Sequence, residues 1–393
     1  MPVAVDGDRI TATSNDEGRV WQVRFVDDLL GAGPDHLPDL FDLCDPIYED
    51  ASEPGPRAVI IDRRIHRLYG EQFSTLFGRY GLEPVWLPIG AGERTKTLAT
   101  YGRLADRLIP LGVARRSQPL YLIGGGVCGD VGAFLAGTLA RGTPAIRVPT
   151  SLLAMADAGV AAKTGINHAG KKNALGTYDP PPLALHCLDF CATETQRRIS
   201  NALAEIAKAA LMDDPALWSL LAQHGKTLRR TRMQVPIARE VLWRAVLVML
   251  AELADNMRER RLTRTMDFGH AITPTCELLH THLWHGEWVA IDMALFIVVS
   301  ALRKLVDWSD AEDILGVLGH TLRLPLWHPA LADRDLLQHA LDATTRHRGG
   351  RLRVPLLHNV GAKEFVDDVT ASELANAASE LHRLAVRLDA VAR

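Results

Sequence analysis

The sequence has few of the features that mark secreted, membrane-bound or nucleic-acid-binding proteins. Its five cysteines are an odd number without the paired spacing of a zinc site, which favours a reducing compartment. The N-terminus has no basic segment followed by an apolar one, so we expect no signal peptide and a cytoplasmic protein. Apolar runs such as 289–301 are interrupted, here by Asp292, and are too short to cross a bilayer. With a formal net charge of −3, we expect neither a membrane nor a nucleic acid as a partner.

What is present is typical of a soluble protein with two domains. At 393 residues the chain exceeds one ordinary hydrophobic core. In the N-terminal half, strand-like runs alternate with helical segments, which predicts a parallel, Rossmann-like sheet with crossover helices. The turn-rich segment 31–56 is interpreted as a surface loop. Helical periodicities dominate the C-terminal half, where 351–357 is the clearest strand-like run. We therefore predict an α/β N-terminal domain over 1–190 and an all-α, mainly helical, C-terminal domain over 191–393.

A glycine-rich stretch follows one of the predicted strands. The apolar run 120–123 leads directly into Gly124, Gly125, Gly126 and Val127, and Asp130 comes three residues later. A strand that feeds a glycine turn and a helix N-terminus can hold a pyrophosphate on backbone N–H groups. The cluster is not the GxGxxG fingerprint, and a tight strand-to-helix turn could also require glycine. The residues alone leave both interpretations open.

Glu205, His270 and His285 are candidate metal ligands. Two imidazoles and one carboxylate with an open coordination position form a typical catalytic divalent-metal set, usually for zinc. The spacing of the three residues is non-local, and a histidine is more often an ordinary surface or core residue. The sequence alone therefore does not establish that they converge.

A set of cationic and amide side chains lies among small residues. Lys163 and Lys208 stand in the apolar contexts AGVAAKTGIN and AEIAKAAL, while Lys172 and Asn173 follow in GKKNALGTY. Lysines are usually solvated at the surface. Lysines in such apolar surroundings are also suited to binding an anionic, hydroxyl-rich ligand, and Arg141 lies nearby in the sequence.

The chain resembles the sugar phosphate cyclase superfamily, whose best-known member is dehydroquinate synthase. The matching segments occur in the family order: GGGVCGD, RGTPAIRVPTSLLAMADAGVAAKTGIN, GKKNALGTY, ALAEIAK, DFGHAITP and HGEWVAIDMA. This resemblance implies a dehydroquinate synthase-like fold and an enzyme that depends on NAD and on zinc, with cobalt as the other candidate metal. It also implies the reaction: transient oxidation of a secondary alcohol, phosphate elimination, re-reduction, ring opening and aldol cyclisation.

The resemblance assigns roles to individual positions. Glu205, His270 and His285 would bind the metal, and Lys163, Lys208, Asp267 and His270 would be catalytic. The substrate-binding set would be Arg141, Asp157, Lys163, Asn167, Lys172, Asn173, Lys208, Asp267, Pro274 and His347. The cofactor-binding set would be Asp62, Glu93, Lys96, Gly124, Gly125, Gly126, Val127, Asp130, Thr150, Ser151 and Lys172. By the same resemblance Arg141 reaches into the site of a neighbouring subunit, which implies a homodimer. No protein base is assigned to the elimination, because the substrate's own phosphate can serve.

Besides a lysine that is missing where Met249 or Leu250 falls, three positions depart from the dehydroquinate synthase pattern. Asp267 replaces an asparagine, Pro274 replaces a histidine, and His347 replaces a lysine. A substrate carboxylate would meet Asp267 without enough positive charge to balance it, which is costly if the group is buried. The segments DFGHxxxP, HGExVAIDMA and RHRGG resemble the 2-epi-5-epi-valiolone synthases, which cyclise sedoheptulose 7-phosphate.

Other interpretations stay open. The residues between His270 and Pro274 differ from those expected in that group, which keeps 2-epi-valiolone synthase as an alternative beside a dehydroquinate synthase-type enzyme. From a different class, a metal-dependent polyol dehydrogenase would have a related architecture. It would transfer hydride in a net sense and release NADH, whereas a cyclase would not.

Overall fold

The computed structural model describes residues 2–31, 55–114 and 117–391. It divides into two compact units. Unit 1 contains Met1–Thr193 and Met249–Arg258, and unit 2 contains Glu194–Val248 and Glu259–Arg393. Residues 32–54, most of the segment interpreted as a surface loop, lie outside the described residues.

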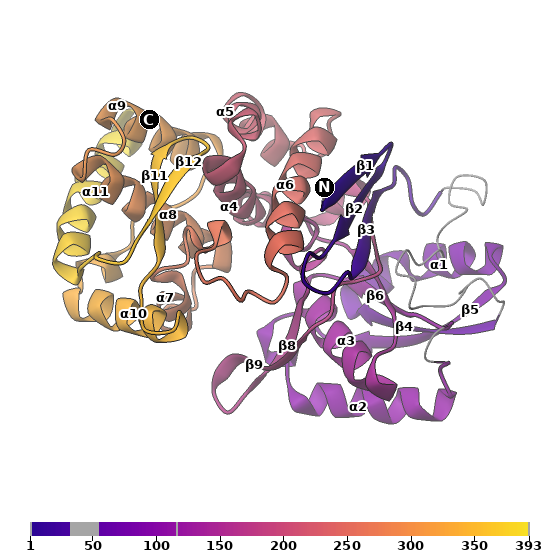
Figure 1. Cartoon of the computed structure of the whole chain (residues 1–393). Helices are drawn as coiled ribbons and strands as arrows, with labels where there is room; N and C mark the ends of the chain where they lie inside the picture. The colour runs from indigo at the N-terminus through magenta and orange to yellow at the C-terminus, as the bar shows by residue number, and fades with distance from the viewer. Residues whose placement is uncertain (1, 32–54, 115–116, 392–393) are drawn as a thin grey trace. The chain divides into compact units, whose positions relative to one another are not determined.

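Unit 1 is built on one eight-stranded sheet with the order β1-β2-β3-β10-β7-β6-β4-β5 (Figure 1). The pairings from β3 to β5 are all parallel, and β1 and β2 extend the sheet by antiparallel pairing. The strands are β1 (Val3–Asp6), β2 (Arg9–Thr13), β3 (Val20–Phe25), β4 (Gly55–Asp62), β5 (Leu82–Ile89), β6 (Leu120–Gly124), β7 (Ala145–Pro149) and β10 (Leu183–His186). The helices are α1 (Arg63–Arg79), α2 (Leu98–Leu108) and α3 (Gly126–Thr138). The predicted α/β fold with a parallel sheet is confirmed.

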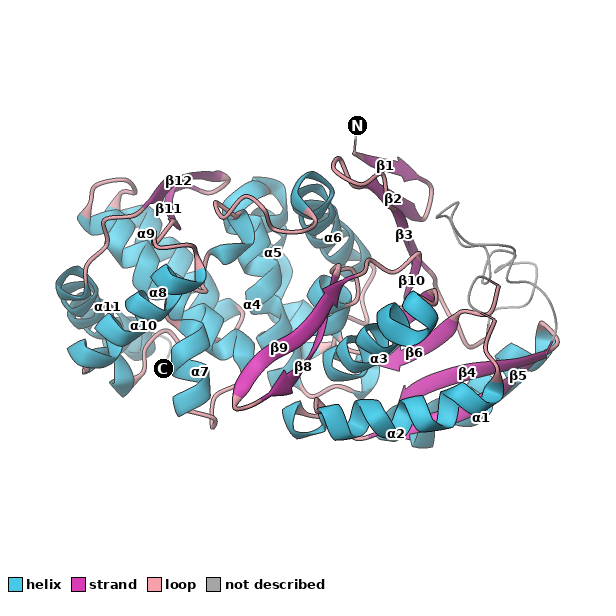
Figure 2. Cartoon of the chain, turned by 60° about the horizontal axis from the view of Figure 1, so that its bottom comes forward, coloured by secondary structure: helices cyan, strands magenta, loops and turns pink. Residues whose placement is uncertain are grey.

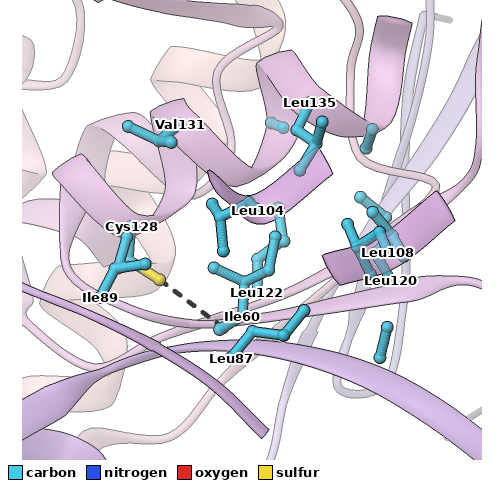
Figure 3. Close-up of a cluster of buried hydrophobic side chains, with 14 of the residues drawn as sticks. Ile60, Leu87, Ile89, Leu104, Leu108, Leu120, Leu122, Cys128, Val131 and Leu135 are labelled. Atoms are coloured by element: carbon cyan, nitrogen blue, oxygen red, sulfur yellow. Dashed lines mark hydrogen bonds between the residues drawn. The ribbon is translucent and has the colours of Figure 1, made fainter. Parts of the chain in front are cut away.

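The core of unit 1 explains why these strands read as continuous apolar runs. Alternate residues of β6 point to opposite faces, and Leu120 and Leu122 join the buried cluster under α2 and α3 (Figure 3). On the other face, Tyr121 packs edge-on against Phe77 of α1, with ring centroids 4.9 Å apart. Because helices cover both faces, both sets of side chains are apolar.

A second ribbon in unit 1 was not predicted. β8 (Lys163–His168) and β9 (Lys171–Tyr178) form a two-stranded antiparallel hairpin, separate from the large sheet (Figure 2). Most of β9 is exposed, so it lacks the apolar alternation by which a half-buried strand is recognised. Its lysines and asparagine also make this segment read as a polar loop. The ribbon carries several of the predicted substrate-binding residues.

Unit 2 is mainly helical, as predicted, apart from one short ribbon, and its helices pack around α8 (His285–Leu302) (Figure 1). By length and composition α8 could cross a membrane, but 89% of it is buried in the protein, as in the core helix of a globular domain. The other helices are α4 (Gln196–Asp213), α5 (Pro215–Arg230), α6 (Ile237–Asn256, which continues into unit 1), α7 (Thr273–Leu279), α9 (Trp308–Gly316), α10 (Arg334–His347) and α11 (Ala371–Val391). The ribbon consists of β11 (Val354–Asn359) and β12 (Ala362–Val366).

Candidate active site

Three predicted metal ligands converge inside unit 2. Glu205 comes from α4, His270 from the loop before α7, and His285 from the first residue of α8. One ligand atom from each lies within 4.8 Å of the others. His285 Nε2 is 3.1 Å and His270 Nε2 is 3.7 Å from the same oxygen, Glu205 Oε1. Three side chains separated by 80 residues of sequence thus surround one point.

Two glycines allow this convergence. A Cβ on Gly286 would lie 1.9 Å from the backbone oxygen of Asn201, so α8 can approach α4 closely only with glycine there. The Gly286 N–H donates to Asn201 Oδ1 at 2.8 Å. Gly269 has a φ of +74° and packs against Val289 of α8, which turns the chain immediately before His270. The glycines beside the two histidines therefore position them.

Each histidine has its second nitrogen engaged away from Glu205. His270 Nδ1 lies 3.2 Å from the Phe268 carbonyl, which can only accept, so Nδ1 carries the proton and Nε2 keeps its lone pair. His285 Nδ1 lies 3.3 Å from Glu277 Oε2. Carboxylates and carbonyls in these positions orient the imidazoles of metal sites.

Lys208 completes the electrostatics of the cluster. Its ammonium forms an ion pair with Glu205 Oε2, and both side chains are almost fully buried. Burial opposes ionisation of Glu205, but the charge of Lys208 and the hydrogen bond with His285 outweigh it and hold the pKa well below its usual range. Of the two lysines singled out for their apolar contexts, Lys208 is buried and Lys163 is exposed.

The pKa values of the two histidines are shifted in opposite directions in this arrangement. Desolvation, aided by the charge of Lys208, lowers the pKa of His270 to about 3. Desolvation also opposes charge on His285, but its hydrogen bonds with Glu205 and Glu277 raise its pKa to about 10. A divalent cation bound to Glu205 would take the place of the His285 proton. The donor set, with one anionic oxygen and two imidazole nitrogens, therefore fits zinc.

Asp267 lies between two arginines that sequence reasoning did not consider. Arg264 Nη2 is 2.6 Å from Asp267 Oδ1, and Arg264 Nε is 3.1 Å from Oδ2. Arg348 Nε approaches the same Oδ2 to 3.3 Å. The Asp267 carbonyl also accepts the His270 N–H at 3.0 Å. The chain therefore balances the charge of Asp267 with two arginines, and the predicted lack of positive charge for a substrate carboxylate stays a prediction.

The other two specificity positions differ in their surroundings. Pro274 lies in the first turn of α7, and His347 is exposed at the end of α10. The neighbour of His347, Arg348, is the residue that reaches Asp267. The start of α7 is fixed by Asp292 of α8, whose Oδ2 accepts the Ile272 N–H at 2.7 Å and the Thr273 N–H at 2.9 Å.

In unit 1 the glycine turn lies where β6 ends and α3 begins. None of its three glycines has a positive φ, so a left-handed turn does not require them. Gly124 is needed for packing, because its Cβ would lie 2.7 Å from Cys128 Cβ. A Cβ on Gly125 or Gly126 would make only ordinary contacts at 3.5 Å. Packing thus explains one glycine, and the other two stand at the N-terminus of α3, where backbone N–H groups can bind a phosphate.

Other predicted cofactor residues gather near this turn. The Thr150 N–H donates to the Gly124 carbonyl at 2.9 Å, which brings Thr150 and Ser151, after β7, beside the end of β6. On α3, Asp130 accepts from Lys96 Nζ at 2.5 Å. Desolvation raises the pKa of Asp130, against the charge of Lys96. Val127 is partly buried against the core, and Asp62 caps α1 by accepting the Arg64 N–H at 2.7 Å.

The β8–β9 ribbon is joined to these cofactor residues by hydrogen bonds. Asn167 Nδ2 donates to Glu93 Oε2 at 2.8 Å, and the Asn167 N–H donates to the Lys96 carbonyl at 2.9 Å. Asn167 Oδ1 accepts the N–H of Asn173, which has a φ of +51°. Residues predicted to bind cofactor and residues predicted to bind substrate are therefore contiguous within unit 1.

The remaining predicted residues lie on connecting segments of unit 1. Lys163 and Lys172 are exposed on the ribbon, and Asp157 is half-buried in a π-helical turn over Ala154–Ala158. Arg141 is exposed, with a φ of +65°, directly after Ala140 at +50°. Two successive non-glycine residues in the left-handed region are strained, which is common at functional sites.

Sequence reasoning missed the residues that support these side chains. Glu277 and Asp292 do not stand out among ordinary helical residues, although Glu277 closely follows DFGHAITP and Asp292 lies within HGEWVAIDMA. Arg264 and Arg348 could have been found from the sequence, because each lies close to a position singled out for specificity. Arg348 directly follows His347, and Arg264 lies three residues before Asp267.

Comparisons with known proteins place these features in a family. The 3-dehydroquinate synthase N-terminal family matches residues 86–201, and the 3-dehydroquinate synthase C-terminal family matches residues 202–344. A 2-epi-5-epi-valiolone synthase of Actinoplanes sp. is 41% identical over 372 residues, which cover 93% of this chain and 91% of that protein. ValA, a 2-epi-5-epi-valiolone synthase from Streptomyces hygroscopicus solved with NAD+ and Zn2+ bound, has a TM-score of 0.85 at 38% identity. That match covers 92% of this chain and 97% of ValA. A 2-deoxy-scyllo-inosose synthase, solved with carbaglucose-6-phosphate, NAD+ and Co2+, shares the fold at a TM-score of 0.77 and 22% identity. It is matched over 94% of this chain and 99% of its own.

Proposed function

This chain belongs to the 3-dehydroquinate synthase family, and we propose that it cyclises sedoheptulose 7-phosphate to 2-epi-5-epi-valiolone. It is an NAD- and zinc-dependent sugar phosphate cyclase. The observation that carries the proposal is the convergence of Glu205, His270 and His285 on one point in unit 2. That convergence supplies a metal site of the kind that the family's chemistry needs.

The cofactors supply the chemistry that side chains cannot. When bound, NAD takes up and returns a hydride, and zinc acts as a Lewis acid on the substrate's alcohol and ketone oxygens. Glu205, His270 and His285 would hold the metal. Lys208, buried and paired with Glu205, keeps the carboxylate ionised and offers its remaining N–H donors to a substrate hydroxyl.

The remaining residues of the chain would bind and orient the substrate. We assign Lys163, Asn173 and Arg141 to the phosphate, where fixed donors stabilise the departing anion. Asp157 would contact hydroxyl groups, together with Asn167 and Lys172. The cofactor would lie against the glycine turn with Asp62, Glu93, Lys96, Asp130, Thr150 and Ser151. The hydrogen-bonded continuity of the ribbon with the Glu93–Lys96 segment supports this assignment.

The substrate choice rests on the end of the sugar that carries no phosphate. A carboxylated heptulosonate would need cations that remain available for its carboxylate. In unit 2 the two arginines around Asp267 are already paired with it. An uncharged polyol end, as in sedoheptulose 7-phosphate, has no such requirement. Pro274 and His347 would line the same end.

We further propose a cytoplasmic homodimer. The assignment of Arg141 to the site of a neighbouring subunit is the reason for the dimer. The strained, exposed turn that carries Arg141 supports the dimer, because such a turn is suited to a residue that contacts another subunit.

Product identification is the most direct test. Protein incubated with sedoheptulose 7-phosphate, NAD+ and Zn2+ should release inorganic phosphate and a seven-carbon cyclitol, and NMR should identify that cyclitol as 2-epi-5-epi-valiolone. A different epimer would favour 2-epi-valiolone synthase. Phosphate release only from a heptulosonate phosphate, which carries a carboxylate, would overturn the substrate assignment.

The same incubation separates a cyclase from a dehydrogenase. A cyclase returns the hydride within each turnover, so NADH absorbance should show no net change while phosphate accumulates. A metal-dependent polyol dehydrogenase would instead produce NADH in proportion to the substrate consumed and would release no phosphate.

A further inference from the structure

Asp267 is held by a more complete set of partners than a surface ion pair. Three contacts to two guanidinium groups engage both of its oxygens: Arg264 Nη2 to Oδ1 at 2.6 Å, Arg264 Nε to Oδ2 at 3.1 Å, and Arg348 Nε to Oδ2 at 3.3 Å. The first two form the bidentate fork by which arginine recognises carboxylates. The third contact is made by Arg348, which lies C-terminal to Asp267 in the RHRGG segment.

This cluster is buried and electrically balanced. The side chains of Arg264, Asp267 and Arg348 are 13%, 8% and 3% exposed. Arg264 also pairs with Glu259, and Arg348 Nη1 donates to the carbonyls of Leu352 and Arg353. In direct contact, two arginines thus face two carboxylates, and Asp292 acts on Arg348 only through its charge. Removing the charge of Asp267 would leave Arg348 buried without a carboxylate in contact. Such an uncompensated charge is strongly unfavourable in a protein interior.

We propose that Arg264 and Arg348 form a carboxylate-binding site that the chain's own Asp267 occupies, and that this internal occupation excludes carboxylated sugar phosphates. The inference rests on the proposed function in one respect, the placement of this cluster at the phosphate-free end of the substrate. It replaces simple repulsion by Asp267 with a different cause. The cations that a substrate carboxylate would need are present but already bound.

The proposal makes Arg264 and Arg348 specificity-determining residues. The bidentate contact sets the distance and plane at which a carboxylate is held. A substrate carboxylate would have to displace Asp267 from both arginines and leave it buried without a partner. Truncation of Asp267 to alanine deletes the carboxylate group and leaves the arginines facing a space of its size. That space should accept a small carboxylate from solution.

Chemical rescue of Asp267→Ala by formate tests this directly. Formate is the group that the substitution deletes, so it should bind with saturation and raise the Tm of Asp267→Ala by several degrees. Equal concentrations of sodium chloride should not, because chloride lacks the two-oxygen geometry. Wild type should show no formate-specific rise. A formate effect of the same size in wild type, or none in the variant, would overturn the proposal.

Two further proteins keep the test decisive. The double variant Asp267→Ala/Arg348→Ala removes one cation of the site, so formate should lose its effect; an undiminished effect would contradict the assignment of Arg348. If Asp267→Ala does not fold, Asp267→Asn keeps the volume while removing the charge. We then expect calorimetry to detect tighter binding of a heptulosonate phosphate to Asp267→Asn than to wild type, at least tenfold. Equal affinities would count against the proposal.

These readouts do not depend on turnover. Formate rescue in a protein that releases no phosphate from sedoheptulose 7-phosphate would refute the proposed function and leave the carboxylate site standing. If the protein releases phosphate from sedoheptulose 7-phosphate but its Asp267 variants bind no carboxylate, the carboxylate site is refuted and the proposed function stands.

Discussion

The tautomer of each imidazole decides whether three side chains can act as one metal site. His270 presents its unprotonated Nε2 because Nδ1 donates to the Phe268 carbonyl, and His285 is oriented in the same way by Glu277. Both Nε2 atoms then face one oxygen of Glu205. A carboxylate and two oriented imidazoles define a binding point before a metal arrives, which lowers the reorganisation needed to bind it.

Replacement of His270 by alanine should remove both metal and activity. The variant loses one of three ligands, so bound zinc should fall to a small fraction of one per chain and phosphate release should become undetectable. Metal analysis of the purified protein measures the first effect, and circular dichroism verifies folding. His339→Ala is the matched control, because His339 is exposed on α10 and is not one of the three clustered side chains. A folded His270→Ala protein with wild-type zinc content would refute the assignment.

The sequence predicted these single residues unevenly. Composition and spacing could name Glu205, His270 and His285 as ligand types, but contacts across 80 residues of sequence depend on tertiary packing, so the resemblance was needed to connect them. Charge balance was predicted least well. The pairing of Arg264 and Arg348 with Asp267 was not predicted, because the sequence does not show which arginine reaches which carboxylate in the fold.

Among the elements, α8 carries the strictest geometric demand. Its second residue, Gly286, lies so close to Asn201 of α4 that a methyl group has no room. This contact fixes the separation of the helix that carries His285 from the helix that carries Glu205. The apolar remainder of α8 anchors it in the core of unit 2.

Gly286→Ala should therefore weaken the metal site through the backbone. The added Cβ must push α8 from α4, at a cost of about 1–3 kcal/mol, and His285 moves with it. We expect zinc affinity, measured by competition with a chelator, to fall by roughly tenfold or more. Gly316→Ala, at the end of α9 where nothing lies within 4 Å of the added atom, should keep its affinity for zinc. Equal affinities in the two variants would mean that this close approach does not position His285.

Asp292 should give the contact between α8 and α7 a pH dependence. Burial raises its pKa to about 6, although the Ile272 and Thr273 N–H groups oppose the shift. The folded protein therefore binds this proton more tightly than the unfolded chain, whose pKa is about 4. The stability gained from the proton is present at low pH and is lost as the pH rises from about 4 to about 6, by roughly 3 kcal/mol.

Asp292→Asn isolates this effect. The amide keeps an oxygen for the two N–H donors but does not titrate. The difference in unfolding free energy, wild type minus variant, should decrease between pH 4 and 7, as measured by urea unfolding at each pH. A difference that stays constant or increases would show that Asp292 is not the group responsible.

For the whole molecule, the fold could be predicted because the pattern and the burial agree. Strands covered on both faces gave continuous apolar runs, and the helices of unit 2 gave clear periodicity. The β8–β9 ribbon was not predicted because most of β9 is exposed, so its lysines and asparagine carry no periodic signal. The predicted boundary at 190 lies close to Thr193, but the assignment of Met249–Arg258 to unit 1 had no sequence signal.

Mixing two inactive variants tests the proposed dimer. Arg141→Ala should lack the phosphate contact that it gives to its partner, and His270→Ala should lack its own metal ligand. In a hybrid dimer, the site that keeps His270 also receives Arg141 from the other subunit, so one site of two is complete. Random exchange makes about half of the dimers hybrids, and about a quarter of wild-type phosphate release should return. If Arg141 instead serves its own subunit, no hybrid contains a complete site and the mixture stays inactive.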